Sequence, residues 1–433
     1  MSARFTIRIS LMALLLVVSG LLLVSAISGS FYQPYHQHDK EDWGFYGHRK
    51  INRMAVFTLP QDMIPFFKQN IEYITEHAID PDKRRYATKH EAVRHYIDID
   101  HHGTFPFPDL PRNWTAALAR YSTILVVPPG EDTIKLVTPE FTRFSREEVT
   151  LKGPGIKVAL NRDSLVIPKV DYLVYFKNNV LPQYYRDDWN LSCTQLDTLL
   201  GLPGVIASCP QIFIEDGLSE FGIIPWHLNK MYYQLVNAYQ SGNPKRILRT
   251  VADFGHYVGD AHVPLHTTTN YNGQLTNQLG IHAFWETRLV ELFSDEYDYF
   301  VGPAEYIENP NEVIWETILE SHILVDSVLA IEKRLSKTFP QDQQFCFEQR
   351  LSSTVRTQCT DYARAFHNEL KGMVEDRFCK AIKTLGDLWY SAWVDAGQPN
   401  LLKTDVAEPD DIPEEDLDQK VREGKPLGRQ HTN

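Results

Sequence analysis

Apolar residues recur at helical spacing through most of the chain. In residues 368–397 they form one stripe, closed by Gly397 and Pro399, that consists of Leu370, Met373, Val374, Phe378, Ala381, Ile382, Leu385, Trp389 and Trp393. Similar patterns run through 48–77, 226–262, 281–294 and 312–338. The sequence therefore predicts a mainly α fold, a multi-helix assembly in which metal or ligand groups project inward.

Two segments interrupt the helical pattern. Residues 103–222 contain clusters of Pro and Gly and β-rich runs such as "IKVAL" and "YLVYF", which predict an insertion of loops and short strands. Residues 401–433 are acidic, rich in Pro and poor in apolar side chains, so we expect a disordered tail. The domain itself is expected to span 43–400.

The N-terminus has the pattern of an export signal. Arg4 and Arg8 precede an uninterrupted apolar run over 9–27, and small residues follow it. We expect residues 1–28 to be a signal peptide, or an N-terminal anchor because the run is long enough to span a membrane, and 29–42 to be a linker. In either case the domain is expected outside the cytoplasm: secreted or periplasmic, or anchored by 9–27 and facing outward.

Composition and charge narrow the class of protein. The chain has 433 residues, 43% of them hydrophobic and 12% aromatic, which is ample for a packed core. The formal net charge of -13 argues against a broad basic surface that grips long nucleic acid. A local cationic site remains possible if bound metal ions supply the charge.

The five cysteines leave at least one unpaired thiol in an exported protein. Cys193 with Cys209 and Cys346 with Cys359 are the locally economical pairs, although the sequence alone does not settle the connectivity. Cys379 then remains as a buried free thiol on an amphipathic helix. Because no two cysteines form a CxxC pair, thiolate zinc sites are disfavoured.

Histidines and carboxylates concentrate in two short stretches of apolar context. In "ADFGHYVGDAHVPLH", His256 and Asp260 stand four apart on one helix face, and His266 follows after a turn at Pro264. In "GIHAFWETRLVE", His282 and Glu286 repeat the spacing. Imidazole and carboxylate are the zinc-binding combination when thiolates are absent.

A single pair of this kind is more often a capping or surface interaction than a metal site, and a lone buried histidine is usually a core residue. Two pairs together with His266, within 31 residues, would leave many buried polar groups that only mutual bonding or a metal could satisfy. The combined pattern therefore favours a metal site.

The N-terminal part supplies further candidate ligands. His48 lies five residues after Trp43 in "WGFYGH", and Asp80 lies fifteen residues before His95. With these spacings the chain resembles the superfamily that joins bacterial zinc-dependent phospholipases C with single-strand-specific zinc nucleases. The resemblance covers 43–102, 226–294 and the last long helix, and implies a mainly helical fold with three zinc ions in one cleft.

The resemblance also implies a ligand set, position by position. Asp80, His95, His256 and Asp260 would hold one zinc, with Asp260 bridging to another. His266, His282 and Glu286 would hold a second. His48, Asp260 and the Trp43 main chain would hold a third. Asp98, Asp100, His101 and His102 are expected as outer partners of these ligands or as turn residues.

The third zinc site departs from the family pattern. In the family the tryptophan is the mature N-terminus and its amine is a ligand, whereas here about fifteen residues would precede Trp43 after signal cleavage. Two hypotheses follow: a later protease trims the chain to Trp43, or the site lacks the amine and binds zinc weakly.

Zinc in such a cleft favours phosphate-ester hydrolysis. Three zinc ions carry +6 and the carboxylates of Asp80, Asp260 and Glu286 return -3, which leaves about +3 for an anionic substrate. Asp80 and Asp260 are the expected catalytic residues, Asp80 by orienting the attacking water. No obligate protein partner is inferred.

The substrate remains open between a phospholipid head group and single-stranded nucleic acid or nucleotide. The spacings from Trp43 to His48 and from Asp80 to His95 resemble the nuclease branch, whereas Glu286 in His-x-x-x-Glu resembles the phospholipase C branch, which is slightly favoured. The alternatives from other classes are a non-catalytic zinc-binding protein and a zinc amide hydrolase, and the absence of HExxH counts against the latter.

Overall fold

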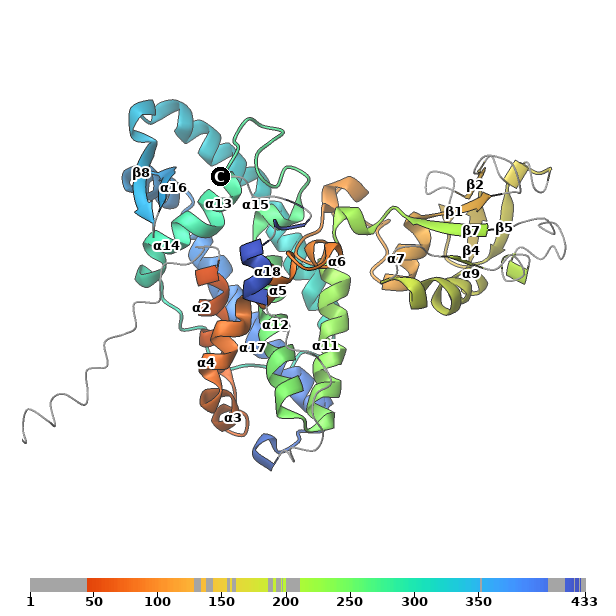
Figure 1. Ribbon diagram of the computed structural model, residues 1–433, viewed down its shortest axis with the longest axis horizontal. Helices are drawn as coiled ribbons and strands as arrows, with labels where there is room; N and C mark the ends of the chain where they lie inside the picture. Colours follow the sequence, from red (N-terminus) through yellow and green to blue (C-terminus); the bar gives the residue numbers. More distant parts are fainter. Residues whose placement is uncertain are drawn as a thin grey trace, which may run out of the picture. The chain divides into compact units, whose positions relative to one another are not determined.

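The computed structural model describes residues 45–127, 134–137, 143–153, 156–157, 161–185, 190–191, 196, 198–199, 211–350, 353–403, 417–423, 425–427 and 429. The expected signal peptide and linker, Trp43, and the cysteines Cys193 and Cys209 lie outside these ranges. The fold is mainly helical, which confirms the predicted class (Figure 1). Among the described residues, no helix combines the length and the apolar character that crossing a membrane requires.

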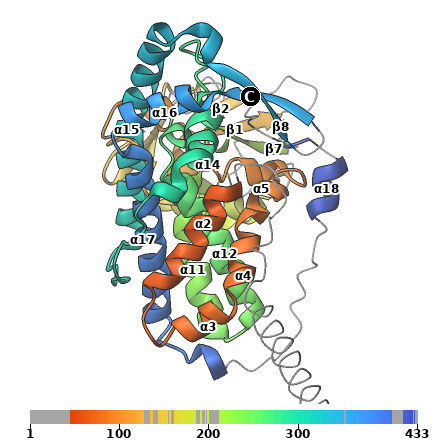
Figure 2. The ribbon, with the colours of Figure 1, turned by 90° about the vertical axis from the view of Figure 1, so that its left-hand side faces the viewer.

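Four long helices form the frame of the domain: α11 (Ile224–Ser241), α12 (Pro244–Ala261), α15 (Pro310–Thr338) and α17 (Met373–Asp395). α12 packs against α11, α17 and α2 (Phe45–Ala55), the first helix of the described residues; Figure 2 shows α2 and α11 beside α12. Apolar side chains of α12 and α17, among them Phe254 and Trp389, are fully buried. α12, the helix that carries His256 and Asp260, is therefore enclosed by neighbouring helices.

Local sequence explains where these helices begin. The Asn243 side chain accepts a hydrogen bond from the Arg246 amide at 3.2 Å, and Pro244 occupies the first helical position of α12. Asn309 caps α15 in the same way, accepting from the Glu312 amide at 3.3 Å. Gly242, with φ of 65°, ends α11 in the left-handed conformation that glycine tolerates.

Shorter elements connect the frame. Before the insertion they are η1 (Val56–Thr58), α3 (Ile64–Gln69), α4 (Ile71–Glu76), η2 (His77–Ile79), α5 (Asp80–Arg84), α6 (Lys89–Ala92) and η3 (Ile99–His102). After α12 they are η8 (Pro264–Thr267), α13 (Ile281–Ala283), the π-helical turn η9 (Phe284–Arg288), α14 (Leu289–Phe293), η10 (Ser294–Glu296), η11 (Gln341–Gln343) and α16 (Thr360–Glu369).

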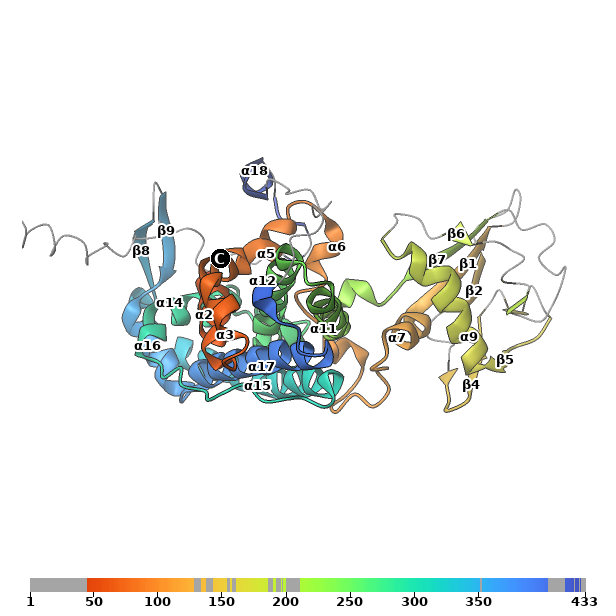
Figure 3. The same ribbon diagram turned by 90° about the horizontal axis from the view of Figure 1, so that it is seen from below.

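The described strands of residues 103–222 form two antiparallel sheets, of order β2-β1-β7-β6 and β3-β4-β5. Their bounds are β1 (Ser122–Val127), β2 (Ile134–Val137), β3 (Arg143–Phe144), β4 (Glu148–Leu151), β5 (Leu165–Pro168), β6 (Asn190–Leu191) and β7 (Gln211–Asp216). The segment also holds α7 (Trp114–Tyr121), α9 (Lys169–Tyr175), η5 (Phe176–Val180), η6 (Leu181–Gln183) and η7 (Ser219–Phe221). Figure 3 shows α7 and α9 grouped with these strands, so the segment is more than loops and strands.

Near the C-terminus, β8 (Phe345–Arg350) and β9 (Ser353–Gln358) form a two-stranded sheet. A disulfide joins Cys346 to Cys359, as the sequence predicts, and Cys379 is a free, partly buried thiol. The described residues between Phe347 and Val355 are grouped apart from the rest of the described chain, and every described site residue belongs to the other unit.

The tail differs from its expectation. Composition predicts disorder over 401–433, but the structure describes η12 (Leu401–Lys403) and the helix α18 (Leu417–Glu423) within it. The contacts of α18 with the body of the domain are polar, as described below, and so lack the apolar period that sequence reasoning detects.

Candidate metal centre

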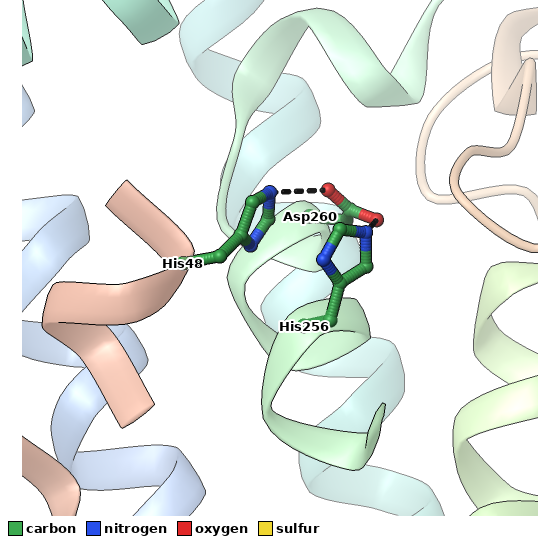
Figure 4. Close-up of side chains that lie close together, drawn as sticks. All are labelled: His48, His256 and Asp260. Atoms are coloured by element: carbon green, nitrogen blue, oxygen red, sulfur yellow. Dashed lines mark ion pairs between the residues drawn. The ribbon is translucent and has the colours of Figure 1, made fainter. Parts of the chain in front are cut away.

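Eight side chains from seven parts of the domain meet at the end of α12. Each comes from a different short element or helix turn: His48 from α2, Asp82 from α5, His95 after α6, His256 and Asp260 from α12, His266 from η8, His282 from α13 and Glu286 from η9. Figure 4 shows His48, on α2, facing His256 and Asp260, on α12.

Asp260 lies at the centre of this cluster. Its Oδ2 is 2.9 Å from His95 Nδ1 and 3.4 Å from His256 Nε2. Its Oδ1 is 3.5 Å from His48 Nε2 and 3.7 Å from His266 Nδ1. The two carboxylate oxygens thus face different sets of histidines, the arrangement that a carboxylate bridging two metal ions requires.

The described residues contain three groups that could hold a metal ion. The groups are His48 with His256 and Asp260; Asp82 with His95 and His256; and His266 with His282 and Glu286. Within each group the potential ligand atoms lie within 4.8 Å of one another. The first two groups share His256, so the potential metal positions adjoin each other.

Main-chain carbonyls fix the orientation of three of the histidine rings. The Nδ1 of His256 lies 2.8 Å from the Ala78 carbonyl, that of His266 2.5 Å from the His95 carbonyl, and that of His282 3.1 Å from the Tyr271 carbonyl. A carbonyl only accepts, so each Nδ1 carries the proton and donates it. When these rings are neutral, each Nε2 holds the lone pair that a metal-ligating histidine requires.

Two glycines allow α2 to approach α12. A Cβ on Gly259 would lie 2.9 Å from His48 Nδ1, and one on Gly255 would lie 2.7 Å from Asn52 Cγ. Asn52 is buried and donates from Nδ2 to the carbonyls of Ile74 at 3.2 Å and Ala252 at 3.0 Å. The glycine spacing in "FGHYVG" therefore positions His48 over the polar face of α12.

Burial favours neutral histidines at one side of the cluster. His48, His95 and His256 are 5%, 4% and 0% exposed, and desolvation lowers the pKa of each ring. Desolvation also raises the pKa of Asp260 well above its usual range. Neutral imidazoles are the form in which histidine binds a metal, and a bound divalent cation would favour the ionised form of the Asp260 carboxyl group.

The third group has a different charge balance. Glu286 Oε2 lies 2.8 Å from His282 Nε2 and 3.3 Å from His266 Nε2. Although burial works to lower the pKa of His266, the carboxylates of Asp260 and Glu286 outweigh it and raise that pKa to about 9. Burial likewise opposes the ionised form of Glu286, but His266 and His282 hold its pKa well below the usual range. The ring of His266 here acts as the counter-ion of two carboxylates.

The structure corrects one expected ligand. Asp80 is in none of the three groups among the described residues, and its Oδ2 lies 2.6 Å from His77 Nδ1. Asp82, two residues later, takes its place: Oδ1 is 3.8 Å from His95 Nδ1 and 3.9 Å from His256 Nε2. Side chains two apart on a helix point to different sides, so only one of the two aspartates can face the cluster.

The other expected ligands, His48, His95, His256, Asp260, His266, His282 and Glu286, all lie in the cluster. Trp43 lies outside the described residues. Of the expected outer partners, Asp100 accepts hydrogen bonds from Thr268 Oγ1 at 2.7 Å and the Thr269 amide at 3.0 Å, and so holds the segment after His266. His101 stacks on Phe221 with ring centroids 3.4 Å apart and plays no part in the cluster.

Sequence reasoning missed two charged residues beside the cluster. Arg85 Nη1 lies 3.6 Å from Asp82 Oδ1; burial raises the pKa of Asp260, and the charge of Arg85 partly opposes that rise. Glu91 is 1% exposed and accepts hydrogen bonds from Tyr257 and, at 2.7 Å, from Arg94 Nη1; its Oε1 lies 4.0 Å from His95 Nε2. The run "DPDKRR" could have pointed to Arg85, because one helical turn separates it from Asp82.

Solvent reaches the cluster at two carboxylates. The side chains of Asp82 and Glu286 are 22% and 18% exposed, whereas that of Asp260 is 2% exposed. A pocket also opens onto His48 and Glu286 and is otherwise lined largely by apolar groups such as Phe378. The cluster is therefore buried at its centre and accessible at its edge.

No family model matches this chain, and no curated protein matches its sequence.

Proposed function

We propose that this protein is an exported zinc-dependent hydrolase that cleaves phosphodiesters. The observation that carries the proposal is the central position of Asp260, whose two oxygens face separate histidine sets within one cluster. Adjoining metal ions that share a carboxylate are the arrangement typical of enzymes that displace a group at phosphorus.

The donor set fits zinc. The three groups offer imidazole nitrogen and carboxylate oxygen and no thiolate, and the histidine rings are oriented by carbonyls. Asp82, His95 and His256 with Asp260 Oδ2 would hold one ion, His48 with Asp260 Oδ1 another, and His266, His282 and Glu286 a third. Bound zinc lowers the pKa of a coordinated water and neutralises charge on phosphate oxygens.

The chain's own residues support an anionic substrate. Asp82, Asp260 and Glu286 are the carboxylates of the cluster, so the count of about +3 with three zinc ions is the same as with Asp80. Arg85 adds a cation beside Asp82. Asp82, which is partly exposed, is placed to accept a hydrogen bond from an incoming water, the role expected of Asp80.

A non-catalytic zinc protein is the main alternative from another class. A structural site is closed by its protein ligands, whereas a catalytic site keeps a position for water or substrate. The exposure of Asp82 and Glu286 at the edge of the cluster favours the open site. Eight side chains shared by three ions also leave coordination positions unfilled.

The test uses the full chain, purified with zinc, and two phosphodiester substrates. Phosphatidylcholine vesicles and single-stranded DNA are incubated with the protein, with a chelator-treated sample as control. We expect chelator-sensitive release of phosphocholine or of nucleotides, and the substrate that reacts assigns the branch. Stoichiometric zinc without hydrolysis of either ester would leave the structural alternative as the correct one.

A further inference from the structure

The described C-terminal residues 417–423, 425–427 and 429, here called the C-terminal strap, lie against the metal-ligand cluster. α18 packs against α5, the helix that carries Asp82 (Figure 1). Asp418 Oδ1 lies 2.7 Å from Lys83 Nζ. Farther along, the Leu427 amide donates to the Arg85 carbonyl at 2.9 Å. The strap therefore lies along α5 and along Arg85, the residue that comes directly after this helix.

The strap is anchored by the side chain of Arg429. Its guanidinium carbon lies 3.5 Å from the centroid of the Tyr96 ring and 4.5 Å from that of Tyr271. The guanidinium also forms an ion pair with Asp98 Oδ2. Only 14% of the Arg429 side chain is exposed. A cation stacked on aromatic rings and paired with a buried carboxylate is a specific anchor, in contrast to a solvated surface contact.

Three residues that contact Arg429, namely Tyr96, Tyr271 and Arg85, adjoin ligands of the cluster. Tyr96 follows His95 directly in the chain, and the Tyr271 carbonyl orients His282. Arg85 adjoins Asp82 through Nη1, while its Nη2 donates to the main-chain carbonyl of Arg429. The cation best placed to meet an anion at the exposed edge of the cluster is thus occupied by the strap.

We propose that the C-terminal strap is an autoinhibitory segment, which competes with the anionic substrate for Arg85 and for the space over Tyr96 and Tyr271. The proposal rests on the proposed function for the charge of the substrate. Because substrate binds only the strap-free form, the apparent dissociation constant equals the intrinsic constant divided by the strap-free fraction. Release of the strap would free Arg85 without any change in the ligands.

The first measurement follows docking in the full chain without recourse to activity. Arg429→Ala removes the anchor, and Lys425→Ala removes the same charge from an exposed position of the same segment. Hydrogen exchange of the Leu427 amide, which bonds to Arg85, is compared between the two variants and the parent. We expect exchange at least about tenfold faster in Arg429→Ala and unchanged in Lys425→Ala, since opening frees this amide.

The second measurement follows access to the centre. Calorimetry gives the dissociation constant of inorganic phosphate for the zinc-supplied full chain. Arg429→Ala is expected to bind phosphate roughly fivefold more tightly, because the strap-free fraction rises. If Arg429 instead contacted the substrate, loss of its positive charge would weaken phosphate binding.

Unchanged Leu427 exchange in Arg429→Ala, or phosphate binding that stays equal or weakens, overturns the proposal. A failure of the proposed function is distinct, because it shows in the parent as absent zinc or absent chelator-sensitive hydrolysis. The exchange comparison needs no metal, and so decides in that case as well whether Arg429 holds the strap.

Discussion

Asp260 and His95 are separated by 165 positions in the chain, and Asp260 Oδ2 lies 2.9 Å from His95 Nδ1. The aspartate comes from the buried face of α12 and the histidine from the turn after α6. Both side chains are almost fully buried. An unsatisfied carboxylate in such surroundings is costly, so the contact depends on histidines and, in our proposal, on zinc.

Replacing Asp260 with Asn removes the proposed bridging charge and keeps the shape of the side chain. We expect bound zinc and phosphodiester hydrolysis to fall together, the latter at least about a hundredfold, because two ions lose a shared ligand. Elemental analysis and turnover are the measurements. Asp295→Asn, at a side chain that is 91% exposed, is the control and should change neither quantity.

Asp80→Asn and Asp82→Asn form a matched pair that tests the corrected ligand. Asp82 faces His95 and His256, whereas Asp80 pairs with His77. We expect Asp82→Asn to lose zinc and at least about tenfold in turnover, and Asp80→Asn to retain most of both, because a lost ligand weakens metal binding directly. The reverse result would mean that Asp80, and not Asp82, is the metal ligand.

Gly259→Ala places a methyl group 2.9 Å from His48 Nδ1 and should displace this ring. We expect the variant to lose about one zinc ion per chain, the ion that His48 would hold. The helix itself should not be weakened, because alanine favours a helix by about 1 kcal/mol relative to glycine. Gly255→Ala is the comparison, since its methyl group meets Asn52 and not a ligand. That variant should lower the thermal midpoint instead.

His102 gives the fold a dependence on pH that is independent of the metal. Burial lowers the pKa of this histidine from 6.5 to about 4, and neither ring nitrogen has a hydrogen-bond partner. As pH falls below 6.5 the unfolded chain takes up the proton first, so the contribution of His102 to stability is complete above that pH and is lost toward pH 4.

His102→Phe removes this titration and keeps a ring against Tyr121. Denaturant unfolding at equal zinc, between pH 7 and pH 4, should show a shallower fall of the unfolding free energy in the variant than in the parent. An equal dependence of the unfolding free energy on pH in the variant and the parent would mean that His102 has the same pKa in the folded and unfolded chain.

Zinc removal should lower stability as well as activity. The carboxylates of Asp82, Asp260 and Glu286 lie in one cluster, and a cation that binds only the folded chain stabilises it by about 2.7 kcal/mol at a hundredfold excess over its dissociation constant. We expect a lower melting temperature after chelation and recovery with added zinc. An unchanged melting temperature would contradict tight binding by this cluster.

Local spacing was sufficient to predict the α12 part of the site. His256 and Asp260 stand four apart in a stretch with helical period, and their side chains do meet, with Nε2 and Oδ2 3.4 Å apart. His282 and Glu286 also meet, although Glu286 stands on a π-helical turn that the period does not predict. The predicted mainly α class is confirmed for the same reason, because long apolar stripes dominate the chain.

The sequence alone could not decide whether Asp80 or Asp82 faces the cluster. Both residues fall in the first turn of the short helix α5, whose start depends on the 3-10 turn η2 just before it. A shift of this start by one or two residues exchanges which aspartate faces His95. Element boundaries are set by such tertiary contacts and not by local preference.

The attachment of the C-terminal strap could not be predicted from the sequence either. Its anchor is one arginine that meets Tyr96, Asp98 and Tyr271, all more than 150 residues earlier in the chain, and a single cation gives no periodic signal. The acidic, apolar-poor composition therefore predicted disorder where the structure has a polar attachment.

The bond from His266 Nδ1 to the main chain of His95 joins two ligands that belong to different proposed ions. Movement of either peptide segment therefore disturbs both coordination spheres at once. We expect these two ions to load together, with sigmoidal uptake on titration, and molecules that hold only one of the two to be scarce. A chain starved of zinc would then divide between molecules with both ions and molecules with neither, so that scarcity reduces the number of competent molecules and leaves the competence of each one intact.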